Sequence, residues 1–153
     1  MKPALAEDLV LQTLRTASTL VRASRRVFRP HGLSEAQFNV LNILAAPARA
    51  AGVTQREISD ILVVDRSNVT GLLDRMEAAG WVRREAVPED RRAWRVRLTA
   101  PGRRLWEKCV PDYARAVQAV VAPLGAEKAR AVRDLLAALE CQAAAMAGGG
   151  DES

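Results

Sequence analysis

Residues 64–102 read VDRSNVTGLLDRMEAAGWVRREAVPEDRRAWRVRLTAPG, and this stretch decides the fold. Its first part predicts a helix that Gly80 ends, because apolar residues recur at steps of three and four before the glycine. Two short extended runs, 81–86 and 93–98, follow, and 87–92 joins them as a charged tip. The stretch therefore predicts a helix and then a basic hairpin, and the buried face of the helix is formed by Val69, Leu72, Leu73 and Met76.

Two short helices are predicted before this stretch, each opened by a capping box. Ser34 with Gln37 starts the first, and Thr54 with Glu57 starts the second. Asp65 is placed to cap the helix that comes after them. The second short helix is expected to bury the stripe formed by Ile58, Ile61 and Leu62.

Longer helices are predicted at both ends of the chain. Residues 3–29 form an amphipathic helix, with a stripe at Val10, Leu14, Ala17, Val21, Ser24 and Phe28. Thr99 and Pro101 open another helix, and a last one begins at about Ala126. Prolines are expected to bend or interrupt this region at Pro111 and Pro123. The three tryptophans are expected to pack against the hairpin and its neighbours: Trp81, Trp94 and Trp106. A place in the lining of an effector pocket is the alternative for Trp106.

Positive charge is concentrated in the hairpin. Between Trp81 and Arg104 eight arginines stand against three acids, so this segment carries the whole formal net charge of +5. Arginine can bind phosphate or a guanine edge through two parallel hydrogen bonds. A solvated basic face is the alternative explanation of the charge alone.

Two short helices and a basic hairpin follow one another in the order of a winged helix-turn-helix. If the apolar face of the second helix is buried, its first turns present side chains able to hydrogen-bond base edges and phosphates, namely Arg66, Ser67, Asn68 and Thr70. A polar cap on an ordinary surface helix is the alternative. The adjacent arginine hairpin favours DNA binding.

The stretch resembles the core signature of the MarR family of bacterial regulators. The similarity covers Thr54, Gln55 and Glu57, the run DRSNVTGLLDRME, Gly80, and Asp90 and Arg92 as the D-x-R of the wing, with Leu98, Thr99 and Gly102 after it. The fold class expected is mainly α with a small β-hairpin wing. The DNA-binding residues expected are Thr54, Gln55, Arg66, Ser67, Asn68, Thr70, Arg75, Asp90, Arg91 and Arg92.

The resemblance also implies a homodimer that binds double-stranded DNA at a pseudo-palindromic operator and acts as a repressor. Residues 1–33 and 99–147 would be dimerisation helices, 34–98 the DNA-binding domain and 148–153 a disordered tail. A small aromatic or phenolic effector would bind between these parts and release the DNA. The effector itself and its residues cannot be read from the sequence.

Other functions find less support. There is one histidine, His31, and there is no nucleophile motif or phosphate-binding loop, so we expect neither an enzyme nor a cofactor nor a metal site. A helical protein-interaction module is the stronger rival, but it leaves the arginine hairpin unexplained. A thiol redox switch at Cys109 or Cys141 stays open, although cysteine in an amphipathic helix is more often a small buried hydrophobe. No signal peptide or membrane span is expected, and the protein is expected to be cytoplasmic.

Overall fold

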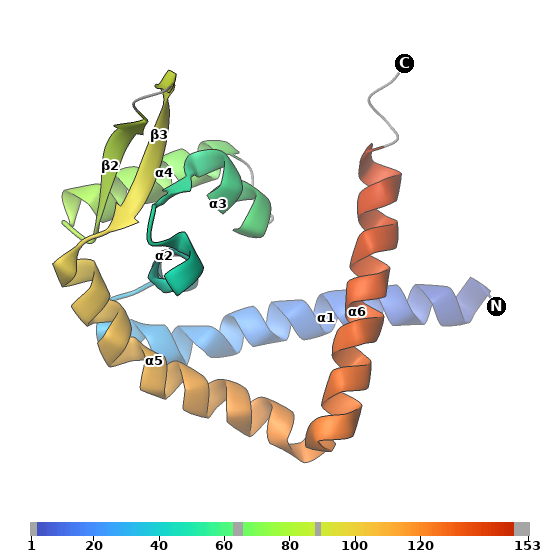
Figure 1. Ribbon diagram of the computed structural model, residues 1–153. Coiled ribbons are helices and arrows are strands. Elements are labelled where there is room, and N and C mark those ends of the chain that lie inside the picture. The colour runs from blue at the N-terminus through green and yellow to red at the C-terminus, as the bar shows by residue number, and fades with distance from the viewer. Residues whose placement is uncertain (1–2, 63–65, 88–89, 149–153) are drawn as a thin grey trace. The chain divides into compact units, whose positions relative to one another are not determined.

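The computed structural model describes residues 3–62, 66–87 and 90–148, with the backbone alone at positions 3, 66–67, 87, 90–93 and 148 (Figure 1). The chain divides into two compact units, Met1–Tyr113 and Ala114–Ser153. The helices are α1 (Pro3–Phe28), α2 (Glu35–Ala45), α3 (Gln55–Leu62), α4 (Arg66–Ala78), α5 (Ala100–Val121) and α6 (Gly125–Gly148). The strands are β1 (Val53–Thr54), β2 (Val82–Val87) and β3 (Asp90–Leu98). The mainly helical fold with a small β-hairpin is confirmed.

Both predicted capping boxes are formed. At α2 the Ser34 hydroxyl accepts a hydrogen bond from the Gln37 amide at 3.2 Å, and the Gln37 side chain accepts one from the Ser34 amide at 2.8 Å. These bonds satisfy N–H groups that have no partner within the helix. They fix the start of α2 directly after the short 3-10 turn Arg29–His31 that ends α1.

The three strands form an antiparallel sheet in the order β1-β3-β2. β1 was not predicted from the sequence. It pairs with β3, with Val53 opposite Val96. The hairpin is longer than predicted, because β2 reaches Val87 and β3 begins at Asp90, which pair with each other across a β-bulge. Positions 88–89 of the predicted tip lie outside the described residues. So does Asp65, the predicted cap of α4.

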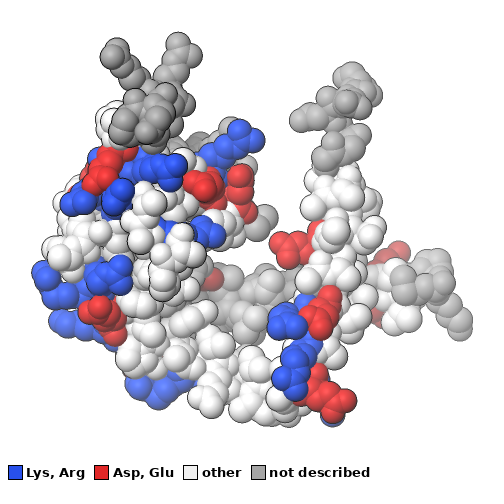
Figure 2. Space-filling view, in the orientation of Figure 1, with Lys and Arg blue, Asp and Glu red and all other residues white. Residues whose placement is uncertain are grey.

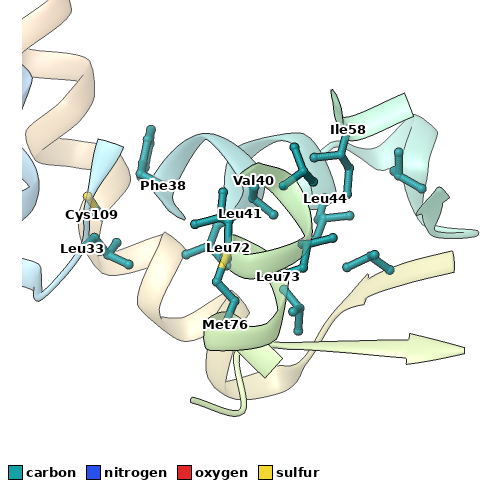
Figure 3. Close-up of a cluster of buried hydrophobic side chains, with 14 of the residues drawn as sticks. Leu33, Phe38, Val40, Leu41, Leu44, Ile58, Leu72, Leu73, Met76 and Cys109 are labelled. Carbon is teal, nitrogen blue, oxygen red and sulfur yellow. The ribbon is translucent and has the colours of Figure 1, made fainter. Parts of the chain in front are cut away.

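One apolar core holds α2, α3, α4 and the sheet together (Figure 3). The predicted inner face of α4 is buried as a whole, and its leucines and Met76 point toward α2. We call this part of the chain, residues 34–98, the winged lobe. Phe28 at the end of α1 stacks on Phe38 with ring centroids 4.6 Å apart, and Tyr113 of α5 lies 4.7 Å from Phe38.

One prediction about burial was wrong. Ile61 is 42% exposed, whereas Ser59 is buried next to Ile58. The face of α3 that carries Ile58 and Leu62 packs against the core. Ile61 lies at the edge of that face and stays partly in solvent. Pro111 does not interrupt α5, because that helix is anchored to the core on both sides of the proline, by Cys109 and Tyr113.

Pro123 does interrupt the helical region, as predicted, in the short 3-10 turn Ala122–Leu124 between α5 and α6. α6 then runs through Gly148, one residue into the predicted tail, whose remainder lies outside the described residues. Large apolar side chains of α6 are exposed, with Leu135 the most exposed of its leucines at 67%. No helix in the described ranges is long and apolar enough to cross a membrane.

Candidate nucleic-acid interface

The start of α3 is held by a dense hydrogen-bond network. Both the amide and the hydroxyl of Thr54 donate to Glu57 Oε2, at 2.7 and 2.6 Å, and the Glu57 amide donates back to Thr54 Oγ1. These two hydrogen bonds from Thr54 lower the pKa of the Glu57 carboxyl, and the positive charges of Arg95 and Arg49 lower it further. The carboxylate is thereby kept charged at the helix N-terminus, where a negative charge is favourable.

α3 and α4 are joined at their outer side as well as through the core. Gln55, the first residue of α3, donates from Nε2 to Thr70 Oγ1 of α4. Both residues belong to the predicted DNA-binding set. The bond sets the distance between the first turns of the two helices, which is the geometry a helix-turn-helix needs to present its second helix to a groove.

The end of α4 sets the direction of the hairpin. Gly80 has φ of 72°, and its amide donates to the Glu77 carbonyl at 2.9 Å. The Trp81 amide donates to the Met76 carbonyl at 2.9 Å. This pair of bonds is the Schellman motif. The motif needs one residue in the left-handed backbone conformation, which glycine adopts without strain. The chain consequently turns back along α4 at once and enters β2.

Arg84 ties the hairpin to α4. Its guanidinium contacts Asp74 Oδ1 and Glu77 Oε2, both at 2.7 Å, and its amide donates to Glu77 Oε1 at 2.8 Å. Burial opposes the charge, but the hydrogen bonds to Asp74 and Glu77 outweigh it and raise the pKa of Arg84. The arginine side chain is 21% exposed, whereas Asp74 and Glu77 are 58% and 38% exposed, so the double ion pair is only partly shielded from solvent. Its two-point contact fixes the angle between α4 and the hairpin.

The opposite face of the hairpin carries a second set of charges. Glu85 accepts from Arg83 at 2.8 Å and from Arg97 at 2.7 Å. Arg95 donates to the Gly52 carbonyl at 3.3 Å, which connects the sheet to the turn before β1. Arg83 and Arg97 thus share a single carboxylate, so the three groups keep a net positive charge. Arg95 forms no ion pair with a carboxylate in the part of the chain that the structure describes.

The base of the hairpin is joined to the start of α5. The Thr99 hydroxyl lies 2.6 Å from the Gly80 carbonyl and 2.9 Å from the Trp81 carbonyl, and it accepts from the Gly102 amide at 3.1 Å. A Cβ added at Gly102 would lie 2.0 Å from the Trp81 carbonyl oxygen. Only glycine permits this close approach of two backbones.

The structure describes five side chains of the predicted DNA-binding set. Thr54 and Gln55 lie at the start of α3, while Asn68, Thr70 and Arg75 lie exposed on α4. The other five fall in the first turn of α4 and at the outer end of β3, where only the backbone is described: Arg66, Ser67, Asp90, Arg91 and Arg92. The elements that carry all ten belong to one lobe.

Three features of this interface were not predicted from the sequence. Arg84 was counted only as a charge. The acidic residues Asp74 and Glu77 near the end of the predicted helix, a few residues before Arg84, could have suggested its pairing. β1 is too short to give a periodic signal. Trp94 was expected to pack against its neighbours and is instead 51% exposed, whereas Trp81 and Trp106 do pack against the core.

Basic side chains surround this interface, with acidic ones set among them (Figure 2). A helix-turn-helix formed by α3 and α4, followed by an antiparallel hairpin rich in arginine, defines the class of winged helix-turn-helix DNA-binding proteins.

Comparison with known proteins gives the family. Residues 31–93 match the model of the MarR family. The chain is 32% identical over 133 residues to the HTH-type transcriptional regulator PecS of Dickeya dadantii, covering 86% of this chain and 80% of PecS. The chain therefore belongs to the MarR family, whose members are transcriptional regulators and not enzymes.

Solved structures agree with this assignment. The M. tuberculosis transcriptional regulator MosR, solved in complex with DNA, is similar with a TM-score of 0.76 and 32% identity, over 90% of this chain and 96% of MosR. CouR from Rhodococcus jostii RHA1, solved bound to p-coumaroyl-CoA, has a TM-score of 0.77 and 28% identity, over 90% of this chain and 95% of CouR.

Proposed function

We propose that this MarR-family regulator is a homodimeric repressor that binds a pseudo-palindromic operator and is released from it by a small aromatic acid. The observation that carries the proposal is a contrast within the chain. The winged lobe has a complete core and a polar, basic outer surface, whereas the long terminal helices expose rows of large apolar side chains.

Dimerisation is supported by these rows. Along α1 the exposed apolar side chains include Leu5, Leu9, Leu14 and Val21, and along α6 they include Val132, Leu135, Leu136 and Leu139. A soluble monomer rarely exposes so much contiguous apolar surface. We assign residues 1–33 and 99–147 to the dimer contact and 34–98 to DNA binding. A two-fold dimer of such lobes calls for two half-sites about ten base pairs apart.

DNA contact is proposed for the ten residues named above. α4 would enter the major groove with Asn68 and Thr70, and the hairpin would reach the flanking minor groove with Arg92. An arginine in a narrow minor groove adds affinity through the concentrated negative potential there. MosR, a protein of the same fold, has been solved in complex with DNA, which supports DNA binding by this chain.

An effector site is supported by two adjoining cavities in the first unit, of about 490 and 520 Å³, which are lined in common by Val21 of α1 and by Ser34, Glu35 and Ala36 at the start of α2. The first adds Arg25 and Arg29, which suit a carboxylate. The second adds Asn68 and Arg75 of α4. A ligand there would contact two of the proposed DNA-binding residues directly, which gives a physical route to release. The ligand of CouR supports an aromatic acyl class.

The decisive experiment is selection of bound duplexes from a random pool, followed by titration of the selected operator with aromatic carboxylates. We expect a palindromic consensus and release by one class of acid. Arg25→Ala should leave operator affinity unchanged and abolish the response to the acid. In a reporter strain, the protein should lower transcription from a promoter that contains the operator.

A matched pair of variants tests the wing. Arg92→Ala should weaken operator binding far more than Arg103→Ala, although each removes one positive charge. Asp90→Ala should also weaken binding despite making the protein more basic. Equal losses for the two arginine variants, together with tighter binding by Asp90→Ala, would reduce the wing to a diffuse positive surface.

A further inference from the structure

Trp94 is the one tryptophan that the core does not use. Its neighbours in type, Trp81 and Trp106, pack against the core, and the Trp106 indole N–H donates to Asn42 Oδ1 at 3.1 Å. Trp94 stands in the middle of β3 and is 51% exposed. An exposed indole leaves a large apolar surface and a hydrogen-bond donor in water, which is typical of a contact surface for another molecule.

The sheet register shows which face of the hairpin carries Trp94. It pairs directly with Ala86, and the next pairs on the same face are Arg84 with Val96 and Val82 with Leu98. Val82 and Val96 are buried, and Arg84 is bound to α4. Trp94 therefore lies on the face turned toward α4, beyond the last pair that contacts that helix, and opposite the small side chain of Ala86.

This position lies between the two elements that the proposed function places on DNA. If α4 occupies the major groove and the tip of the hairpin the adjacent minor groove, the sugar–phosphate strand that separates the grooves passes over the face between them. The residues around Trp94 in the sequence are basic, since Arg91 and Arg92 precede it closely. Arg95 follows it directly, but it points to the opposite face of the hairpin, where it donates to the Gly52 carbonyl. The positive charge of this part of β3 favours the sugar–phosphate strand of DNA over a protein partner.

We propose that Trp94 is a DNA-contacting residue that packs its ring against the deoxyribose of this strand and donates its indole N–H to a phosphate oxygen. The proposal rests on the proposed function. Contacts to sugar and phosphate position a protein without reading sequence. Trp94 accordingly contributes affinity to every duplex the lobe binds and contributes nothing to the choice between operator and random DNA.

The test compares Trp94→Ala and Trp94→Phe with the wild-type protein on the selected operator and on a random duplex. Trp94→Ala should lose about tenfold in affinity for both, which is the size expected for one hydrogen bond to a charged group. Trp94→Phe keeps a ring but lacks the donor, so its loss should be intermediate. The dependence of log affinity on log salt should keep its slope in both variants, because no cation is removed, whereas Arg92→Ala should reduce the slope by about 0.9.

Fluorescence provides a second measurement that does not depend on affinity. Saturating DNA should protect part of the tryptophan emission of the wild-type protein from acrylamide, and this protection should be absent in Trp94→Phe. Equal affinities of wild type and Trp94→Ala, or a loss confined to the operator, would overturn the Trp94 contact while leaving the proposed function standing. A wild-type protein that binds no duplex would overturn both. Unchanged thermal unfolding of the two variants serves as the folding control.

Discussion

The winged lobe and the terminal helices have similar amphipathic patterns, but their apolar faces differ in burial. In the lobe, the stripe of α4 is buried against α2, with Leu73 and Met76 inaccessible to solvent. On α1 and α6, stripes of the same spacing stay exposed, apart from Phe28 at the end of α1. An apolar stripe on a helix thus indicates that a face will be covered, but not whether the cover comes from the same chain.

Truncating the core of the lobe should have the largest effect. Leu73→Ala removes a fully buried side chain and should lower the free energy of unfolding by about 3 kcal/mol through lost burial and a cavity. Urea denaturation measures it. The matched control is Leu135→Ala on α6. If a second chain covers this side chain, as proposed, the cost of the change should depend on protein concentration. A concentration-independent loss at both sites would remove the distinction between the two regions.

A charge in the exposed stripe should affect assembly more than folding. Leu135→Glu should dissociate the dimer, since an unpaired carboxylate would be placed in an apolar contact. Ala137→Glu puts the same charge on the opposite side of α6, at 100° per residue, and should leave the dimer intact. Sedimentation equilibrium measures the mass of each. Wild-type protein that is monomeric at micromolar concentration would contradict the dimer altogether.

Arg84→Ala should have a moderate effect within the lobe. It leaves Asp74 and Glu77 without their shared cation, and because both carboxylates are partly exposed it should cost about 1 kcal/mol of unfolding free energy. Operator affinity should also fall, because the angle between α4 and the hairpin is no longer fixed. Arg83→Ala is the control, since Arg83 is largely exposed and pairs with Glu85 on the other face of the hairpin. Similar losses for both would mean that charge, and not wing geometry, matters.

Glu57 should give the lobe a small dependence of stability on acid. Its pKa in the folded protein lies below the ordinary 4.5, so the carboxylate stabilises the fold above that value, and this contribution is lost as the pH falls through the lowered pKa. Glu57→Gln should flatten this part of the stability profile. An unchanged profile, measured by thermal unfolding at several pH values, would show that the capping bond with Thr54 does not need the charge.

The thiols should have no effect on DNA release. Cys109 is buried in the core, and that burial, with the nearby negative charge of Asp112, raises the pKa of its thiol and disfavours the reactive thiolate. Cys141 is exposed on α6. Replacing both by Ser should leave operator binding in peroxide as it is in the wild type. Oxidant-sensitive release that disappears in the double variant would establish the redox switch.

Local signals in the sequence predicted most of the lobe. Capping boxes at Ser34 and Thr54, the stop at Gly80 and the face of α4 each depend on residues within one or two turns, so periodicity and capping rules reach them. The two-residue β1 could not be predicted, because it exists only through its pairing with β3. The exposed Ile61 and the unbroken helix at Pro111 also depend on contacts distant in sequence.

The DNA contacts assigned to the candidate site stay a prediction, and the bonds that join its side chains could not be predicted from the sequence. Thr70 was assigned to DNA from its place on α4, but its bond to Gln55 fifteen residues earlier could not be read from spacing. The same holds for Arg84, whose partners lie on another element. Long-range pairs of charged or polar side chains depend on the angle between elements, and no single-sequence pattern encodes that angle.

The contact between Gly102 and the Trp81 carbonyl has a mechanical consequence. Because Thr99 and Gly102 hold the first turn of α5 directly against the turn that begins β2, the wing base and this end of α5 cannot rotate independently. Beyond the backbone bonds of the turn at Gly80 and Trp81, the wing is held against α4 chiefly by Arg84. A tilt of the start of α5 would therefore move the wing with it, and the Arg84 ion pairs would limit how far the wing moves relative to α4.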